Sequence, residues 1–196
     1  TWKRTFSSPI LESRIVPATP TQFSIRYGDR HIPIVVPDGV EVNVVGRRDV
    51  ALGDPSAILK AAIQSPLEAP ALRGFLGDAK SALVVVNDAT RSTPTEQILE
   101  AIWSELTRCR NWRVIIASGL HRAPTETELR TLFGTRVADV VPRLLVHDGY
   151  DDSQLVSVDS PVGSVKINRA VLESDRLVLI NSVEPHFFAG YTGGRK

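Results

Sequence analysis

Cysteine and methionine are almost absent from this chain. Its 196 residues contain one cysteine, Cys109, and no methionine. A single cysteine cannot form an internal disulfide, so the composition favours a reducing cytoplasm. Because the initiator methionine is missing as well, we expect a trimmed or partial chain.

The sequence also lacks a strong charge of either sign and any long hydrophobic run. Its formal net charge is +1, which gives no basic field for binding nucleic acid. No apolar run approaches the roughly 18 residues of a membrane span, and no signal-peptide pattern is present at the N-terminus. We therefore expect a small-molecule partner, whose charge is met by local residues, and neither nucleic acid nor a membrane.

From Ser81 onward the chain alternates regularly between apolar runs, polar loops and capped helices. Thr93–Glu96 is a capping box with Pro94 at the first helical position, and Thr125–Glu128 is a second box. Buried strands are predicted at 82–86, 112–117, 144–147 and 177–180. This order is typical of an α/β fold, a mostly parallel Rossmann-like sheet with flanking helices.

The remaining segments are assigned by local signals. A capped helix is predicted over 54–64, with Asp54 as N-cap and Pro55 at the first helical position. Other predictions are an arm or first hairpin at 1–30, strands at 32–36 and 41–45 joined by a turn at 37–39, and a hairpin at 154–167. We accordingly predict an N-terminal arm over 1–30 and an α/β cofactor-binding domain over 31–196.

Three polar loops leave successive predicted strands, at 87–92, 118–122 and 181–196. Ligands of parallel sheets bind outside the carboxyl ends of the strands. If these strands are parallel, the three loops meet at one crevice. The sequence therefore predicts a single ligand site built from all three.

The chemistry of these loops suits an acid–base enzyme acting on an anion. His121 and His186 lie on separate loops and form a natural pair of opposed proton-transfer groups for inverting a carbon centre. Arg91 or Arg122 can hold a carboxylate in a bidentate fork. The helix N-termini after Thr93 and Thr125, together with the Gly193-Gly194-Arg195-Lys196 end of the third loop, suit a phosphorylated or carboxylated ligand.

Each of these residues also has a structural interpretation. Asp88 and Thr90 can simply close a turn or cap the following helix, and His147 at a strand end is more readily structural. His121, His147 and His186 lack the close spacing of a zinc site. The prediction of a site depends on the loops coinciding in space and on no single residue.

Three segments together resemble the signatures of the nickel-pincer lactate racemase family. They are Asn87-Asp-Ala-Thr-Arg-Ser-Thr-Pro94, Ser118-Gly-Leu-His-Arg122 and Glu184-Pro-His-Phe-Phe-Ala-Gly-Tyr-Thr-Gly-Gly-Arg-Lys196, in the family's order. The resemblance extends over most of 32–196, and its third motif is the most specific.

The resemblance implies a nickel-pincer mononucleotide, a pyridinium carrying thioamide and thiocarboxylate arms, attached covalently to Lys196. It implies that His121 and His186 are the catalytic acid–base groups and that Arg91 orients the substrate. The cofactor pocket implied by the matching positions comprises Asp88, Thr90, Gly193, Gly194, Arg195 and Lys196. The family's protein ligand to nickel, a histidine, would lie beyond Lys196, and a C-terminal domain that supplies further substrate contacts would be absent from this chain.

The leading hypothesis is a racemase or epimerase that inverts the C2 centre of a lactate-like 2-hydroxy acid by reversible hydride transfer to this cofactor. An alternative within the family is an epimerase of a larger sugar acid or of a malate-like diacid. An alternative from another class is a non-catalytic α/β domain that binds a phosphorylated or carboxylated metabolite. The last would have no use for His121, His186 or a modified lysine.

Overall fold

The computed structural model of this chain describes residues 10–15, 21–47 and 53–194. The chain divides into two compact units, Thr1–Leu52 and Gly53–Lys196. This division lies later in the chain than the boundary predicted between residues 30 and 31. The reason is that the strands following residue 30 pair with earlier strands and not with the parallel sheet.

The first unit contains two antiparallel strand pairs. Strand β1 (Ile10–Ile15) pairs with β4 (Val42–Arg47), and β2 (Thr21–Tyr27) pairs with β3 (Arg30–Val36). The strands predicted near 32–36 and 41–45 therefore exist, but they are not partners of each other.

A tighter turn explains this difference. Only two residues separate β2 from β3, and Gly28 in that turn has φ +61°, the left-handed conformation that two-residue hairpins favour. The β2–β3 register places Ile25 opposite Ile32 and Phe23 opposite Ile34, so one face of the hairpin is apolar. None of the side chains described between residues 23 and 43 is buried.

The second unit is built on a four-stranded parallel sheet with the order β10-β5-β6-β7. Its strands are β5 (Ser81–Asn87), β6 (Asn111–Ala117), β7 (Leu144–Val146) and β10 (Arg176–Ile180). The prediction of a parallel Rossmann-like sheet is confirmed, as are the four strand positions. The chain leaves β5 toward β6 on one side, while β10 pairs on its other side, so the strand order reverses between β5 and β10.

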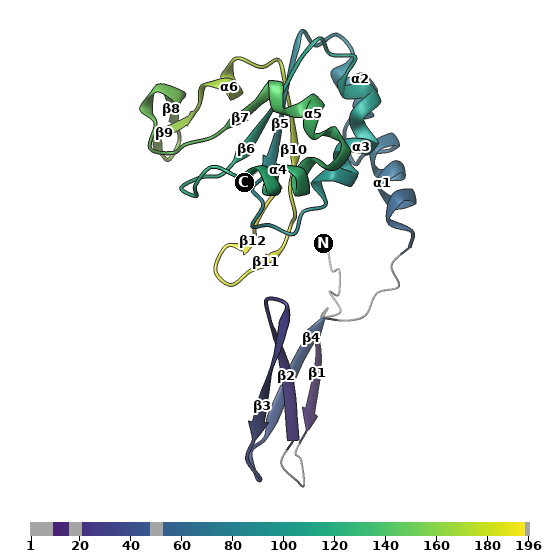
Figure 1. Ribbon diagram of the computed structural model, residues 1–196, viewed down its shortest axis with the longest axis vertical. Helices are drawn as coiled ribbons and strands as arrows, with labels where there is room; N and C mark the ends of the chain where they lie inside the picture. Colours follow the sequence, from purple (N-terminus) through teal and green to yellow (C-terminus); the bar gives the residue numbers. More distant parts are fainter. Residues whose placement is uncertain (1–9, 16–20, 48–52, 195–196) are drawn as a thin grey trace, which may run out of the picture. The chain divides into compact units, whose positions relative to one another are not determined.

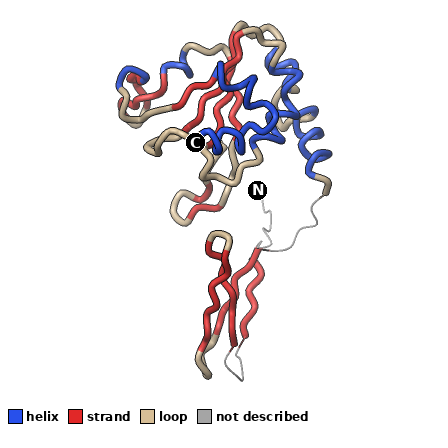
Figure 2. The backbone as a smooth tube through the Cα atoms, viewed as in Figure 1, coloured by secondary structure: helices blue, strands red, loops and turns tan. Residues whose placement is uncertain are grey.

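The helices cover the sheet unequally, as Figures 1 and 2 show. They are α1 (Pro55–Gln64), α2 (Leu72–Leu76), α3 (Thr95–Leu106), α4 (Glu126–Phe133), α5 (Val137–Val140) and α6 (Arg169–Leu172). Short 3-10 helices are η1 (Gly134–Arg136), η2 (Val141–Arg143) and η3 (Asp152–Gln154). Residues of α1 to α5 pack on one face of the sheet, and α6 packs on the other.

The main core lies between the sheet and helices α2 to α5. Alternate strand residues, such as Val84 and Val114, point into it and meet Leu99 and Phe133, all fully buried. The opposite face has a smaller cluster around Leu83, Ile115 and Ala170. Burying a side chain of this size contributes about 1.5–3 kcal/mol, so the first cluster dominates the stability of this unit.

Strand β10 differs from its prediction as a fully buried strand. It lies at an edge of the described sheet, and only Ile180 is buried along it. Leu177 and Leu179 are 37% and 42% exposed, because they face the side on which α6 alone packs. The apolar run has the composition of a central strand, but its position gives it one covered face.

The predicted helix caps are partly correct. Asp54 accepts a hydrogen bond from the Ala57 amide at 2.8 Å, and Thr125 with Glu128 forms the expected capping box. The box predicted at Thr93 does not form, since Pro94 is the N-cap and α3 begins at Thr95. The Thr93 hydroxyl instead bonds to residues of two strand ends, described below.

Two hairpins complete the second unit. Strand β8 (Leu155–Ser160) pairs with β9 (Gly163–Asn168), which confirms the hairpin predicted at 154–167. Strand β11 (Pro185–His186) pairs with β12 (Gly190–Tyr191) in the segment that follows β10. None of the helices in the described ranges has the length and apolar character needed to cross a membrane.

Candidate functional site

The loop that carries His121 is a tight turn at the carboxyl end of β6. The His121 amide donates to the Ser118 carbonyl at 2.9 Å, and Gly119 adopts a left-handed φ of +61°. Ser118 is buried and its hydroxyl donates to the carbonyl of His147 at the end of β7. The turn is therefore attached to the neighbouring strand end through the backbone carbonyl of His147.

The loop after β5 presents Asp88 beside this turn. Asp88 Oδ1 accepts hydrogen bonds from the Thr90 amide at 2.8 Å and from the Thr90 hydroxyl. The Arg91 amide donates to the Asp88 carbonyl at 3.2 Å. The local structure is thus the polar turn that the sequence suggested, and it leaves Asp88 Oδ2 available to a partner from elsewhere.

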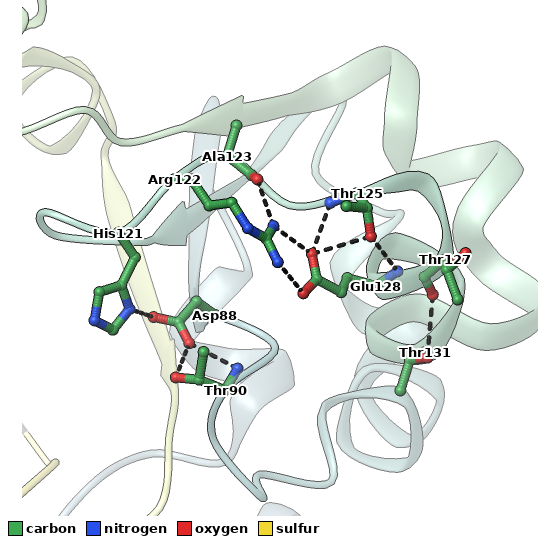
Figure 3. A network of polar contacts seen from close by, with 9 residues as sticks. All are labelled: Asp88, Thr90, His121, Arg122, Ala123, Thr125, Thr127, Glu128 and Thr131. Atoms are coloured by element: carbon green, nitrogen blue, oxygen red, sulfur yellow. Dashed lines mark hydrogen bonds and ion pairs between the residues drawn. The ribbon is translucent and has the colours of Figure 1, made fainter.

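That partner is His121, whose Nδ1 lies 2.8 Å from Asp88 Oδ2 (Figure 3). The Asp88 side chain is 14% exposed and the imidazole is 56% exposed. Burial raises the pKa of Asp88, but hydrogen bonds from Thr90 and His121 outweigh it and hold the pKa below its usual value. Asp88 is therefore a carboxylate at neutral pH, so His121 donates Nδ1–H to it and presents Nε2 outward as the accepting nitrogen.

A cavity of about 230 Å³ opens beside this pair. It is lined by Asp88, Ala89, Thr90, His121, Arg122, Pro124 and Glu128, from the loops after β5 and β6 and from the start of α4. The predicted loops at 87–92 and 118–122 therefore meet at one cavity. A ligand in this cavity would contact both members of the Asp88–His121 pair.

Arg122 is already paired, which removes it as a carboxylate ligand in this conformation. Its guanidinium binds both oxygens of Glu128 at 2.8 Å (Figure 3). The bonds from Arg122, followed by the Thr125 amide, lower the pKa of Glu128 from 4.5 to about 2. Because Glu128 and Thr125 also cap α4, the N-terminus of this helix holds a carboxylate of its own and not the ligand anion that we predicted there.

Arg91 is the second candidate for a carboxylate, and it is exposed on the same loop as Asp88. Within the described ranges, no carboxylate contacts its guanidinium. The two arginines therefore differ: Arg122 supports the start of α4, whereas the Arg91 guanidinium forms no ion pair with the described residues.

His186 is placed on the β11–β12 hairpin beyond the end of β10. Its ring stacks on Phe187 with centroids 4.7 Å apart and meets the edge of Phe188 at 4.7 Å. The amides of Phe188 and Ala189 donate to His186 Nδ1 at 3.4 Å and 3.3 Å. In the described structure no hydrogen bond joins His186 to Asp88 or His121.

The glycine pair at the end of the third loop returns to the sheet. The Gly194 amide donates to Asn181 Oδ1 at 2.8 Å, and Asn181 Nδ2 donates to the Gly194 carbonyl at 2.9 Å. Arg195 and Lys196, predicted for the cofactor pocket, lie outside the described residues. Sequence reasoning did not single out Asn181. Its position as the first polar residue after a strand was the only signal available.

The described residues contain no metal-binding cluster. Across residues 10–15, 21–47 and 53–194 there is no group of three or more histidine, cysteine, aspartate or glutamate side chains placed to hold a metal ion.

The fold and the site define an α/β domain with a carboxylate-held histidine at the carboxyl ends of parallel strands, next to the point where the strand order reverses. Comparison with known proteins identifies the family of this domain. The lactate racemase N-terminal domain family matches residues 27–196, and this chain belongs to that family. The family suggested by the three sequence motifs is therefore confirmed.

Two lactate racemases are similar in sequence. The protein from Thermoanaerobacterium thermosaccharolyticum is 29% identical over 181 residues, which is 88% of this chain and 42% of that protein. The protein from Lactiplantibacillus plantarum is 27% identical over 143 residues, 70% of this chain and 34% of that protein. The chain thus spans less than half the length of these curated relatives.

Solved structures show the same fold. The lactate racemase apoprotein from Thermoanaerobacterium thermosaccharolyticum matches with a TM-score of 0.73 and 27% identity, covering 89% of this chain and 42% of that chain. A protein from Thermotoga maritima matches with a TM-score of 0.52 and 23% identity, covering 72% of this chain and 37% of that chain. The second match supports the fold alone.

Proposed function

We propose that the full-length protein is a racemase or epimerase that inverts the C2 centre of a lactate-like 2-hydroxy acid. The observation that carries this proposal is the 2.8 Å contact between Asp88 and His121 at the carboxyl ends of β5 and β6. An imidazole oriented by a carboxylate can take a proton reversibly from a substrate hydroxyl. Family membership over residues 27–196 supports the same reaction.

His121 acts as a base toward the substrate hydroxyl in this proposal. Its Nδ1–H is directed at Asp88, so the lone pair on Nε2 is free to accept the hydroxyl proton. The imidazolium that results lies beside an ionised carboxylate, which stabilises its charge. Asp88 thereby fixes both the tautomer and the orientation of the ring.

His186 acts as the proton donor on the opposite face of the substrate. Backbone amides donate to its Nδ1, so in the neutral ring the hydrogen is carried on Nε2. The two histidines therefore enter the reaction in complementary states: Nε2 of His121 accepts a proton, and Nε2 of His186 donates one. Reversal of the reaction exchanges these roles.

Arg91 binds the substrate carboxylate. Its guanidinium is exposed and lacks a carboxylate partner in the described ranges, and a bidentate fork matches a carboxylate better than a point charge does. Arg122 is occupied by Glu128 and does not offer a second fork. This arrangement favours a substrate with one carboxylate, such as lactate, over a malate-like diacid.

Lys196 holds the cofactor, a nickel-pincer mononucleotide joined to the lysine amine through a thioamide. When bound, this group supplies a reversible acceptor for the hydrogen and electron pair of the substrate's C2–H bond. What supports this attachment point is that Asn181 hydrogen-bonds the backbone of Gly194, the second residue before Lys196, at the end of β10. The protein ligand to nickel is expected from the chain beyond Lys196.

The test is racemisation by the full-length protein purified from a host that makes the cofactor. Conversion of L-lactate to D-lactate is measured with an enantiomer-specific assay, and peptide mapping around Lys196 measures the covalent adduct. His121→Ala and His186→Ala are each expected to reduce turnover by about 10²–10⁴-fold. His31→Ala, on an exposed position of β3, is the matched histidine control and retains activity.

Two other results would replace this proposal. Turnover of a malate-like diacid or a sugar acid, with none of lactate, would retain the mechanism and change the substrate. In the other result, Lys196 stays unmodified in a host that makes the cofactor, and metabolite binding is unaffected by loss of both histidines. That result would identify a non-catalytic binding domain.

A further inference from the structure

Thr93 is a buried threonine whose hydroxyl contacts two strand ends. Asn87, the last residue of β5, donates from Nδ2 to Thr93 Oγ1 at 2.8 Å. The Ser182 hydroxyl, two residues beyond β10, lies 2.9 Å from the same oxygen, and either hydroxyl can donate. These two contacts, called the Thr93 bridge below, join the carboxyl ends of the strands between which the strand order reverses.

The position of the Thr93 hydroxyl favours this bridge over the capping of α3. A threonine hydroxyl has one hydrogen and two lone pairs, enough for both partners of the bridge. Thr93 is 9% exposed, so water does not readily replace either partner. Among the described residues no side chain caps α3, although Thr93 lies in a capping sequence. The hydroxyl therefore links two strand ends and leaves the helix start without a side-chain cap.

On the β10 side, the bridge meets the base of the loop that carries His186 (Figure 1). Gly193 has φ +74°, and a Cβ atom built on it would lie 1.9 Å from the Ser182 carbonyl oxygen. The side-chain amide of Asn181 makes two hydrogen bonds to the backbone of Gly194, of 2.8 Å and 2.9 Å. The two ends of this loop are thus held together where the bridge attaches.

Backbone hydrogen bonds continue from this base to His186. The Thr192 amide donates to the Glu184 carbonyl at 2.8 Å, and His186 pairs with Gly190 across the β11–β12 hairpin. A displacement of the base therefore displaces the hairpin, and the imidazole with it.

On the β5 side, the bridge meets the support of His121. Asn87 directly precedes Asp88, whose carboxylate lies 2.8 Å from His121 Nδ1. A single buried hydroxyl thus lies between the segments that carry the two histidines.

We propose that Thr93 is a positioning residue that sets the placement of His186 relative to the Asp88–His121 pair. This inference rests on the proposed function, in which both histidines exchange protons with one substrate. No hydrogen bond joins Thr93 to either histidine in the described structure, and it takes no part in proton transfer. Its effect arises because a misplacement of about 1 Å, even one caused far from the reacting atoms, can cost about 10²-fold in rate.

The experiment removes the Thr93 hydroxyl without changing the volume of the side chain. Thr93→Val in the loaded full-length protein should lower turnover of lactate, counted per molecule that carries the cofactor, by about 10–10²-fold. Hydrogen exchange of the Thr192 and Gly194 amides should quicken roughly tenfold, the change expected for loss of about one net hydrogen bond. Thr93→Ser keeps the hydroxyl and should retain both wild-type values.

Two serine variants test the bridge from its other side. Ser182→Ala should reproduce the slower turnover and the faster exchange of Thr93→Val. Ser174→Ala is the matched control, because this partly buried serine lies just before β10 and its hydroxyl donates to the Ala170 carbonyl at 2.8 Å. Its turnover and exchange should equal those of wild type.

A general loss of structure would give a different pattern. The amides of β6, which the bridge does not contact, serve as the internal reference for hydrogen exchange. If their exchange quickens as much as that of Thr192 and Gly194, Thr93 supports the whole fold and the inference is overturned. It is also overturned if Thr93→Ser loses as much turnover as Thr93→Val.

The outcomes distinguish this inference from the proposed function. If wild type racemises lactate and Thr93→Val does so equally fast, Thr93 is not a positioning residue and the proposed function stands. If loaded wild type inverts no 2-hydroxy acid, the proposed function fails. The role of Thr93 in the reaction then fails with it, even where exchange of the loop still depends on the hydroxyl.

Discussion

The two histidines predicted to be catalytic are held in opposite ways. His121 follows a strand of the packed sheet and donates Nδ1–H to a carboxylate, Asp88. His186 lies on a two-residue strand, accepts backbone hydrogen bonds at Nδ1 and is stacked among exposed aromatic rings. The hydrogen bonds at Nδ1 thus decide the tautomer of each ring. Nε2 of His121 is left as an acceptor, whereas Nε2 of His186 carries the hydrogen and is a donor.

The largest effect is expected when the difference between the two histidines is removed by reversing the tautomer of His121. Asp88→Asn can donate to Nδ1, which would move the ring hydrogen to Nε2 and leave both histidines as outward donors. Racemisation by the loaded enzyme should fall by about 10²–10⁴-fold, the range of a positioned acid–base group. Steady-state assays in both directions measure this loss.

Asp151→Asn is the matched control for that change. Asp151 makes the same kind of turn, accepting from the Ser153 amide at 3.0 Å and from the Ser153 hydroxyl, but none of the described histidines contacts it. Its activity should match wild type. Equal losses in the two variants would mean that the turn and not the imidazole contact matters.

The residues that pack near the two histidines should also differ in how much they contribute to the free energy of unfolding. Ile116, fully buried in β6 just before the His121 turn, should cost about 2–5 kcal/mol of unfolding free energy when replaced by alanine. Phe188→Ala, at a side chain 79% exposed beside His186, should change it by less than about 0.5 kcal/mol. Denaturant titration measures both, and similar values would contradict the contrast.

A smaller effect is expected from the ring that stacks on His186. Aromatic pairs contribute about 0.5–1.5 kcal/mol beyond their buried area, so Phe187→Ala should reduce turnover by roughly 2–10-fold without altering Lys196 loading. Val183→Ala, an exposed apolar residue of the same segment, serves as the control. Unchanged turnover in Phe187→Ala would show that the stack does not orient His186.

The smallest effect concerns pH and the helix that follows His121. The folded pKa of Glu128 is about 2 against an ordinary 4.5, so its stabilisation of α4 is present above pH 4.5 and is lost as pH falls toward 2. Hydrogen exchange of the Thr125 amide should quicken across that window relative to its intrinsic rate. Glu128→Gln should flatten the dependence, whereas Glu126→Gln on the same helix should not.

The parallel sheet could be predicted from sequence because its signals are local. Apolar runs bounded by polar loops fixed the strands, and the Thr125–Glu128 box fixed the start of α4. The antiparallel pairs of the first unit could not be assigned, since pairing depends on which strands meet and not on their composition. Similarly, Thr93 lies in a helix-capping sequence, but its hydroxyl forms hydrogen bonds with Asn87 and Ser182. Only the fold brings these residues close to it.

The site was predictable to the extent that parallel strand ends share an edge. That rule brought Asp88, Thr90 and His121 together before any geometry was known. It could not tell Arg91 from Arg122, because the partner of Arg122 is a helix-capping residue whose second role follows from side-chain direction. The link from Asn181 to Gly194 depends on the path of a loop with three glycines, for which no periodic pattern exists.

The edge position of β10 bears on how this chain behaves in concentrated solution. In the described part of the chain, one side of β10 pairs with β5 while its other backbone edge and the leucines at 177 and 179 are open. Such an edge is a template for another strand, in this molecule or a neighbouring one. The β10 edge of the sheet is thus where self-association would begin.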